Sequence, residues 1–258
     1  MNELELAAVT VQVGGRALVD RVSLALGSGD FVALIGPNGA GKTTLIRAAI
    51  GLVRPNAGHV YSRGTRVSEL AARERAARMA WLPQHVRADE PLSALDAVAA
   101  ARFRFSETYA DSCRAAHRAL ERVRAERHAE QSILSLSGGE RQRVAFACLM
   151  AQDASTLLFD EPGNHLDPAQ QLDVYGLLDS AWQDGKTVLC VSHDVNLLRF
   201  LHDVSRIRVI GLAAGRVHFE TRFTAPELPE QMSRLFGVEM AVLTADAARL
   251  IVPRRRTA

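Results

Sequence analysis

A glycine-rich loop near residue 40 ends in a lysine followed by two threonines. Its sequence, GPNGAGKTT, fits the pattern G-x-x-x-x-G-K-[ST] and stands between a continuous apolar run and a helical pattern. Backbone N–H groups of such a loop converge on a β-phosphate, while Lys42 reaches the β- and γ-phosphates and the Thr43 hydroxyl can bind Mg²⁺. We therefore interpret the loop as a nucleoside triphosphate site rather than an ordinary glycine turn. Its residues are Gly36, Pro37, Asn38, Gly39, Ala40, Gly41, Lys42, Thr43 and Thr44.

Two adjacent carboxylates, Asp160 and Glu161, follow the apolar run TLLF. Asp160 can hold Mg²⁺ through water from the side opposite the loop. Because successive side chains of a strand point to opposite faces, Glu161 is directed elsewhere and can accept a proton from an attacking water molecule. Taken alone, the pair could equally cap the end of a strand. Together with the phosphate loop, it predicts hydrolysis of the bound triphosphate.

The composition of the chain is that of an ordinary folded protein. It has 258 residues with Lys+Arg 31 and Asp+Glu 29, a net charge of +2, and 48% hydrophobic residues. This excludes a disordered chain and predicts one large domain or two modest ones. The near-neutral balance argues against a dedicated nucleic-acid-coating protein. Of the 31 basic residues, Lys42 and Lys186 are lysines and the rest are arginines. We therefore expect that the compact charge of a lysine is needed at these positions.

The three cysteines are odd in number and widely spaced. This pattern favours reduced thiols over a disulfide framework and predicts a cytosolic compartment. The chain begins MNELELAAVT, without a basic region leading into an apolar stretch, and no run reaches the ~18 apolar residues that a bilayer span requires. We therefore expect neither a secretion signal nor a membrane span.

The elements that position these residues follow from the apolar patterning. Alternation in the first thirty residues predicts half-buried strands with a turn at the glycines 14–15, and residues 42–52 predict a helix. Continuous apolar runs predict strands that are buried on both faces. Their alternation with helices implies a largely parallel α/β sheet, and the antiparallel start makes the core mixed. Together with the phosphate loop, this resembles the P-loop NTPase fold, here with an antiparallel β part and a helical insertion. The expected buried strands cover residues 31–35, 79–82, 156–159 and 187–191.

Changes in composition divide the chain into parts. Residues 86–134 are rich in Ala, Arg and Glu and lack a strand pattern, so we expect a helical subdomain there. It interrupts a nucleotide-binding α/β core made of residues 1–85 and 135–220. Residues 221–258 then form a short, mixed C-terminal extension.

Two smaller features complete the pattern. The segment IRVIGLAAGRVHFE predicts a hairpin with Gly211 and Gly215 at its turn. His117 and His128 lie in the helical insertion without metal-ligand spacing, so we expect both on the surface.

Six motifs stand in order along the chain. They are GPNGAGKTT at 36–44, Gln84 after a Leu-Pro pair, LSGGE at 136–140, LLFDEP at 157–162, HLD at 165–167, and His193 in VSHD. In this order the sequence resembles the ATP-binding cassette of the ABC transporter family, and the resemblance spans nearly the whole chain. It implies the ABC ATPase fold, with ATP and Mg²⁺ as the bound groups.

The LSGGE segment offers a second anion site. Ser137 can cap the following helix, while the amides of Gly138 and Gly139 point out of its N-terminus, and Glu140 completes the motif. Because the helical insertion separates this segment from the phosphate loop, the family arrangement places the two across a head-to-tail dimer. Two ATP molecules are then held between two copies of the chain.

The resemblance also implies roles for single residues. Glu161 would be the catalytic base, His193 would contact the γ-phosphate, and Gln84 would touch Mg²⁺ or the attacking water and report the nucleotide state to the helical part. Asp167 would cross the dimer interface. Without the other motifs, His193 would be read as an ordinary core or cap histidine, and Gln84 as a loop residue.

Two positions depart from the family pattern. Val13 stands where the family commonly has an aromatic residue that stacks on adenine, so the binding of the base is expected to lose one contact. Gly163 follows Asp-Glu-Pro where the family often has Thr or Ser, and we expect little effect on the chemistry.

The single cassette without membrane helices resembles the ATPases of importers. NHLDPAQQ, VSHDVNLL and the short tail with LFGV look like those of metal-chelate importers for iron-siderophores, haem or cobalamin. The implied partners are a second copy of the chain, integral membrane permease subunits and, through them, an extracytoplasmic solute-binding protein, but no nucleic acid. The implied location is peripheral, on the cytoplasmic face of the inner membrane.

Two alternatives remain open at this point. One is a soluble ABC ATPase without a transport role, of the iron-sulfur cluster assembly type. The other is a nucleotide-gated regulator that binds ATP without hydrolysing it, which the intact Asp160, Glu161 and His193 disfavour. Apolar residues of the insertion either face a permease or pack its own core; they are Leu92, Leu95, Val98, Phe103 and Phe105.

Overall fold

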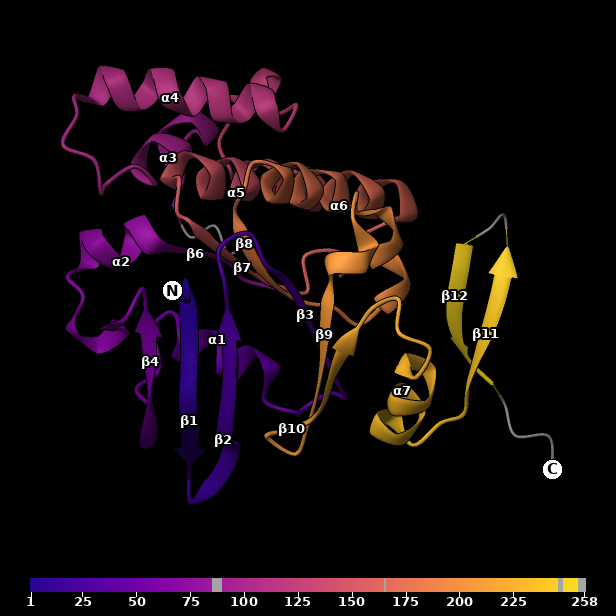
Figure 1. Ribbon diagram of the computed structural model, residues 1–258. Helices are drawn as coiled ribbons and strands as arrows, with labels where there is room; N and C mark the ends of the chain where they lie inside the picture. Colours follow the sequence, from indigo (N-terminus) through magenta and orange to yellow (C-terminus); the bar gives the residue numbers. More distant parts are fainter. Residues whose placement is uncertain (85–89, 165, 246–247, 255–258) are drawn as a thin grey trace.

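The computed structural model describes residues 1–84, 90–164, 166–245 and 248–254. Two β-sheets and the helices around them form layers over two apolar cores (Figure 1). Within the described ranges, every helix is too short or too polar to cross a bilayer.

A six-stranded sheet forms the centre of the molecule. Its strands are β3 (Phe31–Ile35), β6 (Met79–Leu82), β7 (Thr156–Asp160), β8 (Thr187–Val191), β9 (Arg208–Ala213) and β10 (Arg216–Arg222). They lie in the order β10-β9-β3-β8-β7-β6, with β10 antiparallel at one edge and the other pairs parallel. Every residue of β3, β7 and β8 is buried, since both faces of the sheet are covered. The four buried strands expected from apolar runs are therefore confirmed.

A second, antiparallel sheet covers one face of the first. Its strands are β1 (Leu4–Val13), β2 (Arg16–Leu26), β4 (Ala57–Ser62) and β5 (Thr65–Arg66), in the order β2-β1-β4-β5. The glycines 14–15 form the turn between β1 and β2, as expected. Helix α1 (Lys42–Ala49) packs with this sheet, and Leu6, Leu45 and Leu189 belong to the same buried cluster. The amino end of α1 is thereby held against the central sheet.

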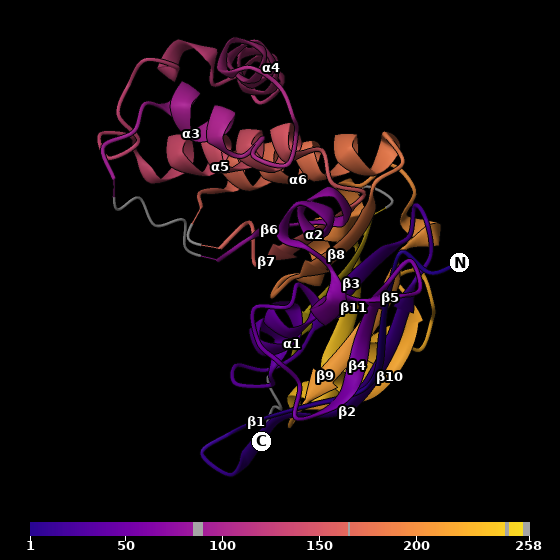
Figure 2. The ribbon, with the colours of Figure 1, turned by 90° about the vertical axis from the view of Figure 1, so that its left-hand side faces the viewer.

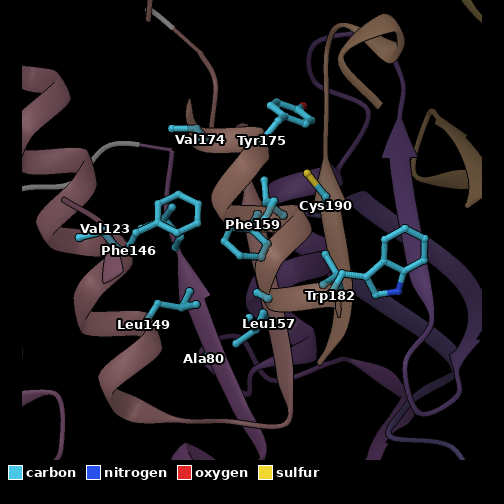
Figure 3. Close-up of a cluster of buried hydrophobic side chains, with 14 of the residues drawn as sticks. Ala80, Val123, Phe146, Leu149, Leu157, Phe159, Val174, Tyr175, Trp182 and Cys190 are labelled. Carbon is cyan, nitrogen blue, oxygen red and sulfur yellow. The ribbon is translucent and has the colours of Figure 1, made fainter. Parts of the chain in front are cut away.

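Helices α5 (Gly138–Gln152) and α6 (Pro168–Gln183) cover the opposite face of the central sheet. Figure 3 shows the core between them and the strands. Phe146 of α5 stacks on Phe159 of β7 with ring centroids 5.3 Å apart, and Trp182 of α6 meets Phe31 of β3 edge-on at 5.1 Å. The first pair packs α5 on the sheet and the second packs α6.

A group of helices lies on the outer side of α5. It contains α3 (Ala94–Ala100), α4 (Tyr109–Arg122) and the short turn η2 (Glu126–His128). Figure 2 shows α3 and α4 stacked beyond α5, away from both sheets. Ala115, Leu120 and Val123 are buried there. Two further short elements, η1 (Val67–Glu69) and α2 (Ala72–Arg78), lead into β6.

The chain ends in a helix and a hairpin beside the central sheet (Figure 1). After η3 (Val195–Phe200) and η4 (Val204–Arg206), the last elements are α7 (Leu228–Phe236), β11 (Met240–Ala245) and β12 (Ala248–Pro253). The Asn196 amide donates to the Ile251 carbonyl at 3.0 Å and accepts from the Ile251 N–H at 2.8 Å. This pair of bonds ties the hairpin to η3.

Two expectations about local structure are wrong. The helix expected over 42–52 ends at Ala49, because Gly51 adopts a left-handed φ of +76° that terminates it. Gly211 lies inside β9, and the β9–β10 turn is made by Ala214 and Gly215. A Cβ at Gly211 would lie 2.3 Å from the Phe219 ring, so close packing within the sheet explains this glycine.

Candidate functional site

The phosphate loop joins β3 to α1 and packs backbone to backbone on β2. Gly41 has a φ of +100°, and a Cβ there would lie 2.2 Å from the carbonyl oxygen of Leu18. A Cβ at Gly215, in the β9–β10 turn, would lie 2.8 Å from the same oxygen. The Gly215 N–H donates to the Ala40 carbonyl at 3.1 Å. The loop is therefore held by both sheets.

The ammonium of Lys42 is folded back into this loop. Its Nζ donates to the carbonyls of Gly36 at 2.8 Å and Pro37 at 3.1 Å, and the residue is 6% exposed. Burial lowers the pKa of Lys42, while the carboxylates of Glu161 and Asp160 oppose that change. A positive group thus faces two carboxylates from inside the loop.

Asp160 closes β7 beneath the loop and is 1% exposed. Burial raises its pKa, and the hydroxyl of Thr43 opposes the rise. Among the described residues, no group forms a hydrogen bond with the buried Oδ1 atom of Asp160. An unsatisfied carboxylate oxygen beside a threonine hydroxyl fits Mg²⁺, which binds through one or two carboxylates and substrate phosphates.

Glu161 is brought together with Gln84 and His193 at the ends of three neighbouring strands. Its Oε2 accepts from Gln84 Nε2 at 2.7 Å and from Asn164 Nδ2 at 3.0 Å, and its Oε1 pairs with His193 Nε2. Glu161 has a φ of +54°, an uncommon backbone conformation for a non-glycine residue. Asn164 stands in the quoted NHLD segment, but the sequence assigned it no role.

A cavity of about 490 Å³ lies over the loop. This volume is within the range of small-molecule sites. Val13 is 62% exposed and is absent from the lining, whereas Leu18 contributes to it, which the sequence did not indicate. The lining residues are Leu18, Asn38, Gly39, Ala40, Gly41, Lys42, Thr43, Thr44, Gln84, Glu161, Asn164 and His193.

The LSGGE segment begins α5, outside the lining of this cavity. Ser137 caps the helix as expected, with its Oγ accepting from the Glu140 N–H at 3.4 Å. The Glu140 carboxylate accepts from the Ser137 N–H at 3.0 Å and from its hydroxyl at 2.7 Å. Those bonds lower the pKa of Glu140, as do His128 and Arg127 to a smaller degree. Gly138 and Gly139 form the first turn.

His117 is exposed as expected, but the surface position expected for His128 is wrong. His128 is 6% exposed, and its Nε2 lies 3.3 Å from Oε1 of Glu140. The turn η2 folds this histidine under the start of α5. The residue spacing around His128 in the sequence did not indicate its contact with Glu140.

Two further quoted positions, Asp167 and Gly163, are among the described residues. Asp167 is exposed and caps α6, with its Oδ1 accepting from the Gln170 N–H at 2.9 Å. His165 of the HLD motif falls outside the described residues. A Cβ at Gly163 would lie 3.4 Å from the Tyr175 ring, an ordinary contact, so the backbone here does not require glycine for space.

Comparison with known proteins reveals close relatives over nearly the full length. The chain is 33% identical to the iron(3+)-hydroxamate import ATP-binding protein FhuC of Bacillus subtilis strain 168, covering 95% of this chain and 91% of that protein. It is 35% identical to the hemin import ATP-binding protein HmuV of Rhodopseudomonas palustris strain BisA53, covering 97% and 94%.

Solved structures share the fold. A dimeric ATP-binding cassette bound to ADP and Pi in a post-hydrolysis state is 28% identical with a TM-score of 0.76, covering 86% of this chain and 99% of that one. A structure assigned to the metal-chelate type of ABC transporter has a TM-score of 0.82 at 23% identity, covering 99% and 98%. The sequence model of the ABC transporter family matches residues 19–164, which include the loop, Gln84, LSGGE and both carboxylates. The chain belongs to the ABC transporter family, as one of its ATP-binding proteins.

Proposed function

We propose that this chain is the ATP-hydrolysing subunit of an importer for metal chelates of the iron-siderophore, haem or cobalamin type. The observation that carries hydrolysis is the Glu161 carboxylate, which Gln84 and Asn164 orient beside the cavity that contains Lys42. The full-length relatives named for hydroxamate and hemin import support the class of solute. Binding of ATP in the loop and its hydrolysis would supply the energy for transport.

The described side chains divide the work of hydrolysis among them. Glu161 takes the proton of the attacking water, since its carboxylate faces the cavity and is held by neutral amide donors. His193, 41% exposed on its side chain, stands next to that carboxylate and contacts the γ-phosphate. Lys42 exchanges its bonds to two loop carbonyls for the β- and γ-phosphates.

A magnesium ion belongs to the same site. Thr43 and Asp160 would hold it, Asp160 through water, and Gln84 would complete its surroundings. The ion would neutralise charge on the phosphates. The free Oδ1 of Asp160 supports this assignment.

A second copy of the chain completes the nucleotide site. Within one chain, Ser137, Gly138 and Gly139 do not line the cavity over the loop, so their amides are available to a triphosphate on another copy. Glu140 shapes that end of α5, and Asp167 would lie at the interface. ATP would close this head-to-tail dimer and hydrolysis would reopen it. The dimeric relative bound to ADP and Pi supports the arrangement.

Integral membrane permease subunits are the second class of proposed partner, and they would bind at the helical part of the chain. An apolar groove of about 280 Å³ lies between β6, α3 and α5, next to Gln84 in sequence, and Leu82, Ala97 and Val144 contribute to it. Two of its lining residues, Trp81 and Arg141, carry buried donors, Nε1 and Nε, without a partner among the described residues. A permease segment could fill the groove with an apolar side chain and accept hydrogen bonds from these two donors with its carbonyl or carboxylate oxygens.

The five apolar residues singled out in the insertion are absent from the lining of this groove; they are Leu92, Leu95, Val98, Phe103 and Phe105. Val98 is fully buried in the core, whereas Phe103 is 52% exposed at another place on the helical part. We propose a peripheral location on the cytoplasmic face of the inner membrane, with an extracytoplasmic solute-binding protein reached through the permease. Nucleic acid has no role in this proposal.

Capture of membrane partners tests the transport assignment. The Glu161→Gln chain, loaded with ATP, is mixed with solubilised membranes of its own host, and bound proteins are identified by mass spectrometry. We expect a polytopic permease, and we expect Ala97→Arg to remove it, because the new side chain fills the groove. Ala100→Arg, on the exposed face of the same helix α3, is the control and should leave capture unchanged.

Two outcomes would contradict this assignment. Recovery of soluble partners alone would favour the cluster-assembly type of ABC ATPase. Equal loss of the permease in both arginine variants would exclude the groove as its docking site.

Val13 offers a test of how the base is bound. Val13→Tyr is expected to tighten ATP binding about fivefold, because an aromatic ring there stacks on adenine, a contact of roughly 1 kcal/mol. Equilibrium titration with ATP and GTP measures the effect and its base selectivity. An unchanged affinity for both would mean that the base binds elsewhere, for example on Leu18.

A further inference from the structure

A buried histidine lies under the start of helix α5. Its Nδ1 is 2.9 Å from Oε1 of Gln131, and its Nε2 accepts a hydrogen bond from Arg127 Nε at 2.9 Å. In this arrangement both ring nitrogens of His128 have a hydrogen-bond partner. Such a residue is fully bonded, yet the hydrolysis described above does not use it.

One carboxylate connects this histidine to the cap of the signature helix. Glu140 turns Oε2 toward Ser137, from which it accepts two hydrogen bonds. Its other oxygen, Oε1, lies 3.3 Å from Nε2 of His128. Any change in the bond at Oε1 therefore acts on the group that orients Ser137.

Arg127 connects the imidazole to the same carboxylate. Its Nε donates to Nε2 of His128, and its Nη2 lies 3.7 Å from Oε1 of Glu140. The Arg127 side chain is 76% exposed, so the histidine holds an otherwise solvated cation against the capping carboxylate. The charged groups placed against the ring are Arg127 from its own turn and Glu140 from α5.

We propose that His128 is a positioning residue for the signature helix. Through Glu140 it orients Ser137 and the first amides of α5, and so sets how strongly this end of the helix binds the ATP held by a second copy. This inference rests on the proposed head-to-tail dimer.

The experiment uses the full chain with Glu161→Gln, so that ATP is bound and not consumed. His128→Leu keeps the apolar packing and removes both nitrogens, whereas His128→Gln keeps an oxygen that can accept from Arg127 and an amide that can donate to Glu140. His117→Leu, on the exposed face of α4, is the matched control. Light scattering gives the ATP concentration for half-maximal dimerisation of each variant. Titration at low protein concentration gives the affinity of the single chain for ATP.

We expect His128→Leu to raise the ATP concentration for dimerisation roughly tenfold, the cost of losing a bond to a charged group. The affinity of the single chain for ATP should not change. His128→Gln should restore part of the affinity of dimerisation, because its amide can replace the contacts of the imidazole.

Other results would overturn the inference. If His128→Leu and His117→Leu behave alike, or if His128→Gln restores none of the lost affinity, His128 does not act through Glu140. Loss of single-chain ATP affinity in both His128 variants would indicate a general packing defect. Absence of ATP-driven dimers in every chain would instead overturn the proposed dimer.

Discussion

Replacement of Glu161 by glutamine is expected to lower ATP turnover by at least about a hundredfold, the usual contribution of a general base. Glutamine has the same shape and can still pair with Gln84 and Asn164, but it cannot take a proton. Binding of ATP should persist, since Lys42 and the loop are unchanged. Steady-state phosphate release and equilibrium ATP titration measure the two quantities separately.

Glu69→Gln is a matched control for this change. Glu69 is exposed and forms a 3.7 Å surface pair with Arg66, a type of contact that contributes little. Its turnover should equal that of the wild type. If Glu161→Gln retained more than about a tenth of the wild-type rate, the general base would have to be another group.

Lys42→Ala should weaken ATP binding roughly a hundredfold, because charge-assisted bonds to the phosphates are lost. The change also leaves the carbonyls of Gly36 and Pro37 without their donor and removes the cation that faces Asp160 and Glu161. Turnover should fall with binding. A fluorescent nucleotide analogue measures the affinity, and thermal unfolding checks that the loop still folds.

The chain supplies its own control, since Lys186 is the other lysine. Lys186 pairs with Asp153 at 2.6 Å, and that aspartate is 58% exposed, so Lys186→Ala should leave ATP binding unaltered. Equal affinity of Lys42→Ala and wild type would mean that the phosphates are held by backbone amides alone.

Most of the nucleotide site was predictable because its residues lie in short contiguous motifs. The loop that contains Lys42 and the strand that ends in Asp160 and Glu161 each carry a local pattern. Gln84 and Glu161 are 77 residues apart, yet both follow buried strands that could be recognised as apolar runs. Parallel strands place their carboxyl ends along one edge of a sheet, so the fold class already implied that these side chains meet.

The rest of the site depends on packing that no local pattern encodes. Leu18 reaches the cavity because β2 crosses the loop, and Asn164 bonds to Glu161 because the chain turns back after β7. His128 is buried by the turn between two helices, although Glu126, Arg127 and Glu130 around it are charged. The sequence placed Gly211 in a turn because glycine is common in turns. The reason for a glycine inside the strand is the Phe219 ring packed against it, which only the structure shows.

The carbonyl of Leu18 has a consequence for how the protein opens. This one oxygen lies so close to Gly41 and Gly215 that neither position has room for a Cβ. Gly215 also forms backbone hydrogen bonds with Ala40 and Asp20. Neither sheet can therefore detach without exposing the loop. The phosphate site and the β9–β10 turn thus belong to one cooperative unit of local unfolding. Bound ATP would slow amide hydrogen exchange in that turn as well, on a segment outside the lining of the nucleotide cavity.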